Sequence, residues 1–191
     1  MAQSKFIQAV KDEAKGRPRS TQWYRDKIKE FGKPTTMDLI RDGKRDNKPF
    51  YGKLNMFIYD PKFKKKLPYY DTFPLTVCIR RYPTGFLGLN LHYIAPRYRA
   101  ILMDGLYDFF TDYEGDYAFN IRYPAVKSVS RLRWAKPCLK RYFYRNVNSR
   151  IVEVQPEHMD FVTLLPSQRF RTGVNFNKFS ALDVYRNRLF L

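Results

Sequence analysis

Apolar residues recur at helical spacing through the first fifty residues of the chain. The pattern predicts one helix over residues 3–15, a second over 22–31 and a shorter third over 35–43. The sequence GRPRS at 16–20 contains glycine and proline and separates the first helix from the other two. Gly43 is a suitable residue to end the third helix. The beginning of the chain is therefore predicted to be helical.

The period of the apolar pattern changes to two after Gly52. Alternation over 53–60, 72–82 and 86–94 predicts three strands. A lysine-rich segment, DPKFKKK, lies between the first two strands, and the turn sequence PTG lies between the last two. This arrangement predicts an antiparallel β-meander over residues 52–95.

The helical period returns after Pro96. We interpret the second half of the chain as mainly helical, with one short strand near its middle. The predicted elements are a helix over 97–110, a basic helical stretch over 125–148 that is interrupted at Pro137, a strand over 151–154, a short helix over 157–165 and an amphipathic helix over 179–191.

The order helices, strands, helices favours an α+β fold over a regular alternation of strand and helix. We expect a small antiparallel β-sheet or an SH3-like barrel with N-terminal and C-terminal helices. The expected organisation is a basic N-terminal arm at 1–19 and a single α+β domain at 20–191, which is helical over 20–50, a β-meander over 52–95 and mainly helical over 97–191.

The composition adds a strong positive charge to this picture. The 191 residues include 36 Lys and Arg against 18 Asp and Glu, a formal net charge of +18. An apolar fraction of 44% and an aromatic fraction of 17% are too high for a disordered basic tail, so the chain is expected to fold. A folded protein with this charge favours a polyanionic partner, and nucleic acid is the commonest one. The chain has no apolar run long enough to span a bilayer, so we expect a soluble, intracellular protein without a membrane partner.

The strand predicted over 86–94 carries one of the two histidines. Gly88, Asn90 and His92 lie on one face of it, opposite an apolar face. Because Gly88 allows a bulky ring or another backbone to approach closely, Asn90 and His92 are expected to lie beneath a covering helix. We interpret His92 as a structural histidine that is hydrogen-bonded within the core, since no second histidine stands in a nucleophile or metal motif.

Neither the cysteines nor the acidic residues form a strong metal or catalytic motif. Cys78 and Cys138 lack metal-ligand spacing and are expected to be free thiols. Asp104, Asp108 and Asp112 stand four residues apart on one predicted helical face, a pattern compatible with a Mg²⁺-dependent nuclease but more typical of a solvated helix or a patch that meets basic surface. We therefore expect no enzyme activity, no metal, no cofactor and no small-molecule substrate.

A basic and aromatic segment between 131 and 150 is the main candidate for nucleic-acid binding. Its density of positive charge can neutralise several phosphates without selecting a sequence, and exposed aromatic rings can stack on bases at a strand end. Tyr142 and Phe143 are expected to be core residues, and a solvated basic face is the alternative for the whole segment. The candidate binding residues are Arg131, Arg133, Trp134, Lys136, Lys140, Arg141, Tyr144, Arg145 and Arg150.

A second candidate is the lysine-rich segment, which the meander places at a hairpin tip beside Phe63. Its candidate binding residues are Lys62, Lys64, Lys65 and Lys66. Such a tip can contact a DNA backbone or groove, although lysines at a turn also serve solubility alone. The basic arm at 1–19 is expected to become ordered when it meets a partner.

Three long segments together carry a resemblance to a known family. They are GKLNMFIYDPKFKKKLPYYDTFPLTV, GFLGLNLHYIAPRYRAILMDGLYD and KPCLKRYFYRNVNSRIVEVQPEHMDFVTLLPSQRF. They resemble small basic virion proteins of T-even-type tailed bacteriophages, including those of marine cyanobacteria, over residues 20–175, with the arm before Ser20 outside the resemblance. The resemblance implies a DNA end protector or head-completion protein, located in the virion and in the host cytoplasm during assembly. It supplies no catalytic motif.

The sequence and the resemblance together leave three functions open. The first is non-sequence-specific binding of double-stranded DNA by a structural protein of a tailed phage particle that protects genome ends. The second is an adaptor of the neck, tail or baseplate that binds acidic virion proteins without contacting DNA. The third, less favoured function is that of a Mg²⁺-dependent nuclease. The expected partners are accordingly double-stranded DNA and other phage virion proteins.

Overall fold

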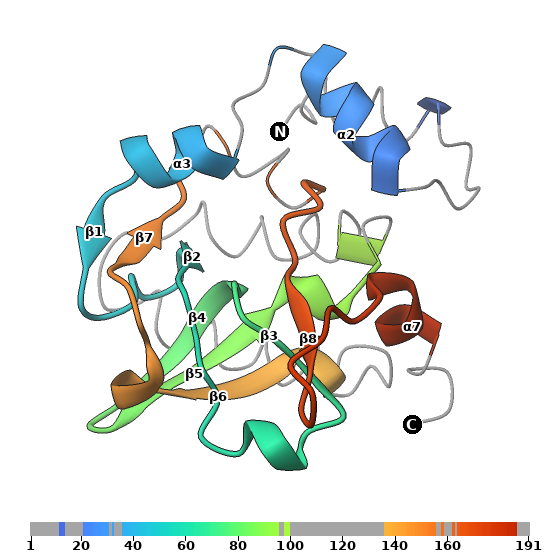
Figure 1. Ribbon diagram of the computed structural model, residues 1–191. Helices are drawn as coiled ribbons and strands as arrows, with labels where there is room; N and C mark the ends of the chain where they lie inside the picture. The colour runs from blue at the N-terminus through green and yellow to red at the C-terminus, as the bar shows by residue number, and fades with distance from the viewer. Residues whose placement is uncertain are drawn as a thin grey trace.

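The computed structural model describes residues 12–13, 21–30, 32, 36–95, 98–99, 136–155, 158, 162 and 164–186 (Figure 1). Most of the predicted N-terminal arm, almost all of the helix predicted over 97–110 and the acidic residues Asp104, Asp108 and Asp112 lie outside these residues. The same holds for most of the helix predicted over 157–165.

An open antiparallel sheet of six strands forms the centre of the described structure. Its strand order is β1-β7-β2-β4-β5-β6. The strands are β1 (Arg45–Asp46), β7 (Ile151–Glu153), β2 (Leu54–Met56), β4 (Leu75–Tyr82), β5 (Gly85–Asn90) and β6 (Leu139–Phe143). Because β1 and β6 are at opposite ends of this order and do not pair, the sheet formed by the described residues is not closed, and the SH3-like barrel is not found there.

A second, smaller sheet consists of two antiparallel strands from distant parts of the chain. They are β3 (Tyr69–Asp71) and β8 (Phe170–Thr172). Ring contacts join this β3–β8 ribbon to the 3₁₀ turn that follows β5, where Tyr93 lies 6.1 Å from Tyr69 and 5.2 Å from Phe170 between centroids. In Figure 1 the ribbon crosses in front of β5 and β6. The ribbon therefore covers one end of the large sheet.

Helices precede and follow the strands of the sheet along the chain. Helices α2 (Thr21–Glu30) and α3 (Thr36–Asp42) precede it, and α7 (Ala181–Arg186) follows β8. Short 3₁₀ turns connect the strands. They are η1 (Lys64–Lys66), η2 (Leu91–Tyr93), η3 (Lys136–Cys138) and η4 (Tyr144–Asn146). An antiparallel sheet with a few peripheral helices is consistent with the α+β class (Figure 1).

The predicted meander is correct in part. Strands β4 and β5 form the expected hairpin, with Tyr82 opposite Gly85 across the PTG turn, and β2 pairs with β4. However, β3 leaves the large sheet to pair with β8. The lysine-rich segment is consequently not a hairpin tip: it connects two sheets, and its last three lysines form η1. The alternation within residues 53–82 contains no information that β3 pairs with β8, a strand from the C-terminal part of the chain.

The helix predicted over 125–148 is wrong where the structure describes it. Residues 139–143 form β6, which pairs along most of β5, with Leu89 opposite Leu139 and Gly85 opposite Phe143. Strand β6 forms here because Tyr142 buries its ring against Phe86 and Phe57, at 5.1 and 5.2 Å between centroids. This tertiary contact outweighs the local helical pattern.

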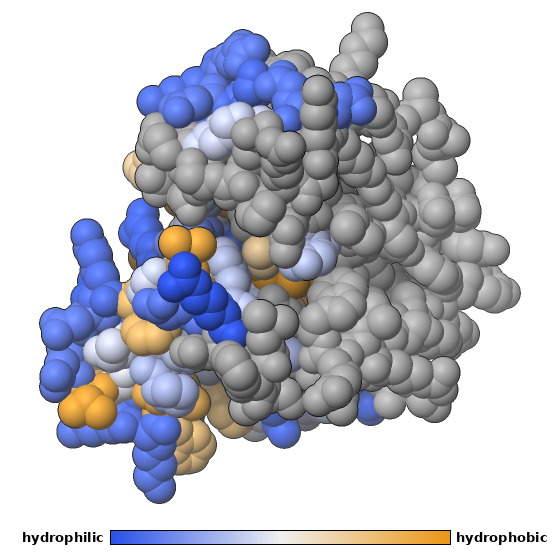
Figure 2. Space-filling model, turned by 90° about the vertical axis from the view of Figure 1, so that its right-hand side faces the viewer, coloured by the Kyte–Doolittle hydropathy of each residue, from blue (hydrophilic) through white to orange (hydrophobic). Residues whose placement is uncertain are grey.

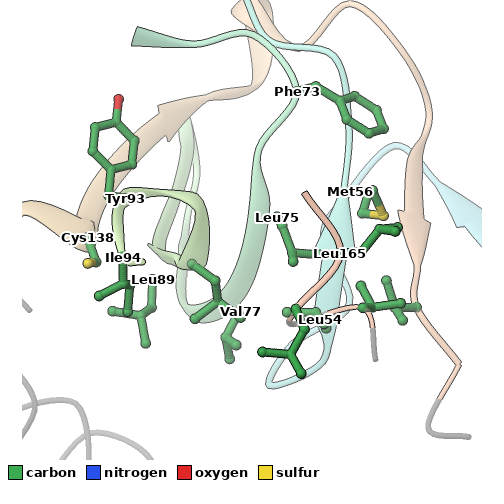
Figure 3. Close-up of a cluster of buried hydrophobic side chains, with 14 of the residues drawn as sticks. Leu54, Met56, Phe73, Leu75, Val77, Leu89, Tyr93, Ile94, Cys138 and Leu165 are labelled. Carbon is green, nitrogen blue, oxygen red and sulfur yellow. The ribbon is translucent and has the colours of Figure 1, made fainter. Parts of the chain in front are cut away.

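Two groups of buried side chains stabilise the fold. The larger group lies against β2, β4 and the end of β5, and includes Leu54, Leu75 and Leu89 (Figure 3). The smaller group is aromatic, with Phe57, Tyr59, Phe86 and Tyr142 beside Cys78 and Ile151. Both cysteines lie within the described residues and are buried thiols, as predicted.

Gly173, in the turn after β8, allows η1 of the lysine-rich segment to pack against the small sheet. A Cβ atom at this position would overlap the carbonyl oxygens of Lys64 and Leu67. Only a residue without a side chain permits this close approach. The turn after β8 and η1 are therefore packed backbone against backbone.

Candidate nucleic-acid interface

Two basic segments that are far apart in the sequence lie side by side in the structure. The Asp60 N–H donates to the Asn146 carbonyl at 2.9 Å, and the Asn146 side-chain amide donates to the Asp60 carbonyl at 2.8 Å. Tyr59 and Val147 form a β-bridge beside these bonds. The start of the lysine-rich segment is thereby fixed next to the end of β6 and η4.

The lysine-rich segment presents most of its charge to solvent. Lys62, Lys65 and Lys66 are exposed, and within the described part of the chain they form no ion pair. Lys64 is half-buried and pairs with Asp60, with 2.8 Å between Nζ and Oδ2. The hydrogen bond to Asp60 raises the pKa of Lys64, and the Asp60 carboxylate balances the charge of this lysine within the protein. Three of the four predicted lysines are thus available to an external anion.

The basic residues of β6 and η4 are arranged around aromatic rings. The Arg141 guanidinium lies 4.9 Å from the Tyr82 ring centroid and 5.5 Å from that of Phe143, and Arg145 lies 5.8 Å from Phe143. Lys140 Nζ lies 4.3 Å above the Tyr93 ring, and burial lowers the pKa of this lysine. Arg141 and Arg145 are exposed, so rings restrict their side chains without removing their charge from solvent.

The remaining predicted residues fall in different places. Arg150 is exposed just before β7. Tyr144, predicted as a stacking residue, is half-buried against Phe86, with 6.1 Å between ring centroids. Tyr142 is buried as expected. Arg131, Arg133 and Trp134 lie outside the described residues, as does the side chain of Lys136.

A cavity of about 220 Å³ joins the two basic segments. Lys62 from the first segment and Lys140 and Arg141 from the second contribute to its wall, together with several tyrosine and phenylalanine rings. Phe63 was expected beside the lysines of the first segment, whereas Tyr69 and Tyr93 were not among the residues predicted for this site. The missing signal is the β3–β8 pairing, which carries Tyr69 to the wall and depends on a strand one hundred residues away in the chain.

A buried hydrogen-bonded network holds two lining residues of this cavity, Asp71 and Tyr142, in place. Asp71 Oδ2 lies 2.7 Å from His92 Nδ1, and His92 Nε2 lies 2.9 Å from Ser167 Oγ. Asn90 donates to Asp71 at 3.2 Å and to the Tyr142 hydroxyl at 3.0 Å, and the backbone N–H groups of Phe73 and Arg169 donate to Asp71 Oδ1. His92 is thus a buried, hydrogen-bonded core histidine as predicted. Among the described residues, its ring is bonded by Asp71 of β3 and by Ser167 just before β8, and no described helix supplies a partner.

The charges of this network follow from burial. Burial penalises the imidazolium and, with some help from Arg99, lowers the pKa of His92 despite the adjacent carboxylate. Burial opposes ionisation of Asp71. The interaction of Asp71 with His92 and the hydrogen bonds that the Asp71 carboxylate accepts outweigh this penalty and lower the pKa of Asp71. Near neutral pH the pair is therefore a carboxylate and a neutral histidine. The order Asp–His–Ser matches a hydrolase triad, but Ser167 is only 9% exposed, so we interpret it as structural.

This network predicts a loss of stability in mild acid. Unfolded His92 takes up a proton near its ordinary pKa of 6.5, whereas folded His92 does so only at lower pH. Because the unfolded state then binds more protons, the free energy of unfolding should fall as pH decreases below 6.5, by at most about 1.4 kcal/mol per pH unit from this residue. Urea unfolding at a series of pH values measures it. The His158→Gln variant should still lose stability below pH 6.5, and the His92→Gln variant should not. If stability depended on pH equally in both variants, His92 would not be the residue responsible.

The character of the described helices and of one surface bears on membrane contact. None of the described helices has the length and apolar character needed to cross a bilayer. On the face shown in Figure 2, hydrophilic residues cover the top, where α2 lies in Figure 1, and hydrophilic and hydrophobic side chains are neighbours at the lower left. Exposed Phe63 and Leu67 lie among the lysines of the first basic segment.

Comparison with known proteins gives one family. The chain matches the family described as phage T4 terminal DNA protecting protein over residues 3–188. The match includes almost all of the arm before Ser20, which the resemblance found in the sequence had left out. No curated protein and no solved structure matched the chain. Since the match spans nearly its whole length, this phage protein belongs to the terminal DNA protecting protein family.

Proposed function

We propose that this protein is a structural component of the phage particle that binds double-stranded DNA without sequence preference and protects the genome ends. The observation that carries the proposal is the meeting of the two basic segments beside one aromatic cavity. Family membership supports the association with DNA termini. The proposed role is that of a binding protein and not of an enzyme, in the virion and in the host cytoplasm during assembly.

The distribution of charge supports contact with several phosphates at once. Lys62, Lys65 and Lys66 are exposed on one side of the junction, and Arg141 and Arg145 are exposed on the other. Phosphate contacts of this kind supply affinity and position a duplex, but they do not read sequence. Because rings hold Arg141 and Arg145 in place, these side chains lose little freedom when they bind a phosphate.

The test is a titration of binding against salt with linear DNA. About six phosphate contacts should give a slope near −5 for the logarithm of the binding constant against that of salt concentration. Changing Lys62, Lys65 and Lys66 to Gln should make the slope about three units shallower. The control changes Lys29, Lys44 and Lys48, three exposed lysines outside the two segments, and should leave the slope nearly unchanged.

End protection is tested with covalently closed circular DNA of equal length as a competitor. A protein that protects termini should bind the linear form more tightly at matched salt. Equal affinity for the two forms would contradict end recognition. Absence of any DNA binding at low salt would overturn the whole proposal and favour an adaptor that binds acidic virion proteins.

A further inference from the structure

The cavity between the two basic segments has the size and lining of a site for a small aromatic group. Pockets for drug-sized ligands measure roughly 300–1,000 Å³, and this one measures about 220 Å³. Seven of its thirteen lining residues are tyrosine or phenylalanine. Such walls bind flat rings by stacking and edge contacts. The size favours a single ring system over a larger ligand.

The walls also carry positive charge that lacks an ion-pair partner among the residues that the structure describes. Among the described residues, no carboxylate forms an ion pair with Lys140 or Lys62. Lys140 is half-buried, and its Nζ lies 4.3 Å from the centroid of the Tyr93 ring. A partly desolvated ammonium beside a ring favours an external anion. The carboxylate in the wall, Asp71, is already bonded to His92 and Asn90 and is 1% exposed, so it does not repel such an anion strongly.

The edge of β6 adds backbone groups to the cavity. Strand β6 is the last strand in the order of the large sheet, and its residues 140–143 line the cavity. The Phe143 N–H points away from β5 and donates to the Tyr59 hydroxyl at 3.3 Å. Alternate residues of an antiparallel strand direct their N–H and C=O groups to the same side, so those of Arg141 also face this edge. A donor and an acceptor are thereby placed where a polar ring could bond to them.

An aromatic cavity, adjacent unpaired cations and a strand edge with backbone donors and acceptors together fit one ligand class. We propose that this cavity binds a single unpaired nucleotide at the end of a DNA strand, with its base among the tyrosine rings and its phosphate near Lys140 and Lys62. This inference rests on the proposed function and adds to it. The basic segments contact duplex phosphates anywhere, whereas the cavity requires a base that is not paired, which an intact duplex offers only at its termini.

The test uses DNA hairpins that have one open end. The five substrates end blunt, with a one-nucleotide 3′ overhang, with a one-nucleotide 5′ overhang, or with the abasic equivalent of each overhang, which has the same charge. The full-length protein should bind one of the two overhangs about 5- to 140-fold more tightly than its abasic equivalent, which corresponds to the range of base–aromatic stacking. A 2-aminopurine base in the overhang should lose fluorescence on binding.

Two tryptophan substitutions distinguish binding in the cavity from binding to the surrounding surface. Leu67→Trp places a large ring at the mouth of the cavity and should abolish the preference for a base over an abasic site. Val174→Trp adds the same ring at a site that is 75% exposed and does not line the cavity, so it should keep that preference. Lys140→Gln should weaken binding of the overhang hairpin several-fold. Circular dichroism of each variant confirms that the fold is retained.

Failure of this inference can be distinguished from failure of the proposed function. Tight, salt-dependent binding of linear DNA with equal affinity for base and abasic overhangs would overturn the cavity assignment alone. If no DNA binds, the cavity is tested with 2-aminopurine deoxyribonucleoside monophosphate at millimolar concentration. Fluorescence that is unchanged in this titration, or changed equally by wild type and Leu67→Trp, would overturn the assignment.

Discussion

Replacing Asp71 with alanine should lower the free energy of unfolding by about 3–5 kcal/mol, the range found when one partner of a buried ionic network is removed. The Asp71 carboxylate accepts hydrogen bonds from His92, Asn90 and the backbone N–H groups of Phe73 and Arg169. Alanine would remove the acceptor of four buried or half-buried hydrogen bonds, of which only the Asn90 amide keeps a second partner, the Tyr142 hydroxyl, and each unsatisfied N–H group carries a desolvation penalty. The loss is therefore larger than that of a single hydrogen bond.

Urea unfolding followed by tyrosine fluorescence measures this loss. The matched control is Asp42→Ala, since Asp42 is 53% exposed and pairs with Arg41 at the end of α3. A surface pair of this kind contributes about 1 kcal/mol or less. If the two alanine variants lost similar stability, the network around Asp71 would not join the sheets as described.

Replacing Phe86 with alanine should cost about 3–5 kcal/mol, as for other buried aromatic residues in well-packed cores. Phe86 is fully buried in β5, and its ring lies 5.5 Å from Phe57 and 5.1 Å from Tyr142 between centroids. Its removal creates a void between β5 and β6. Because Tyr142 also lines the cavity, the variant should weaken the binding site as well as the fold.

The shift of the urea midpoint at constant slope is the appropriate measurement. Phe86→Leu keeps part of the contact and should lose clearly less stability than Phe86→Ala. Leu182→Ala removes a side chain that is 55% exposed in α7 and should change stability by less than about 0.5 kcal/mol. A Phe86→Ala loss as small as that of Leu182→Ala would contradict the aromatic packing.

Local features of the sequence were predicted well. The hairpin of β4 and β5 follows from alternation on both sides of the PTG turn, and this information lies within twenty residues. Gly88 was expected to admit a bulky ring, and a Cβ atom there would lie 3.3 Å from the Tyr142 ring. Helix α3 ends just before Gly43, as its pattern indicated.

The parts that failed depend on distant partners. Strand β6 contains Leu139, two basic residues and two aromatic residues, a mixture that shows no clear alternation by itself. Its conformation is determined by the edge of β5, some fifty residues earlier. Likewise, the candidate site depends on the meeting of Lys62 with Lys140 and Arg141. Charge counting identified both basic segments as candidates, but it contained no information that they would share one cavity.

The close packing at Gly173 links the position of positive charge to the pairing of strands. Since the turn after β8 lies directly against the backbone of η1, Lys65 and Lys66 are positioned by a residue from the other half of the chain. A substitution or a bound partner that displaces β8 would therefore move these lysines as well. Under the proposed function, the strength of DNA binding by these lysines would therefore depend on the position of β8.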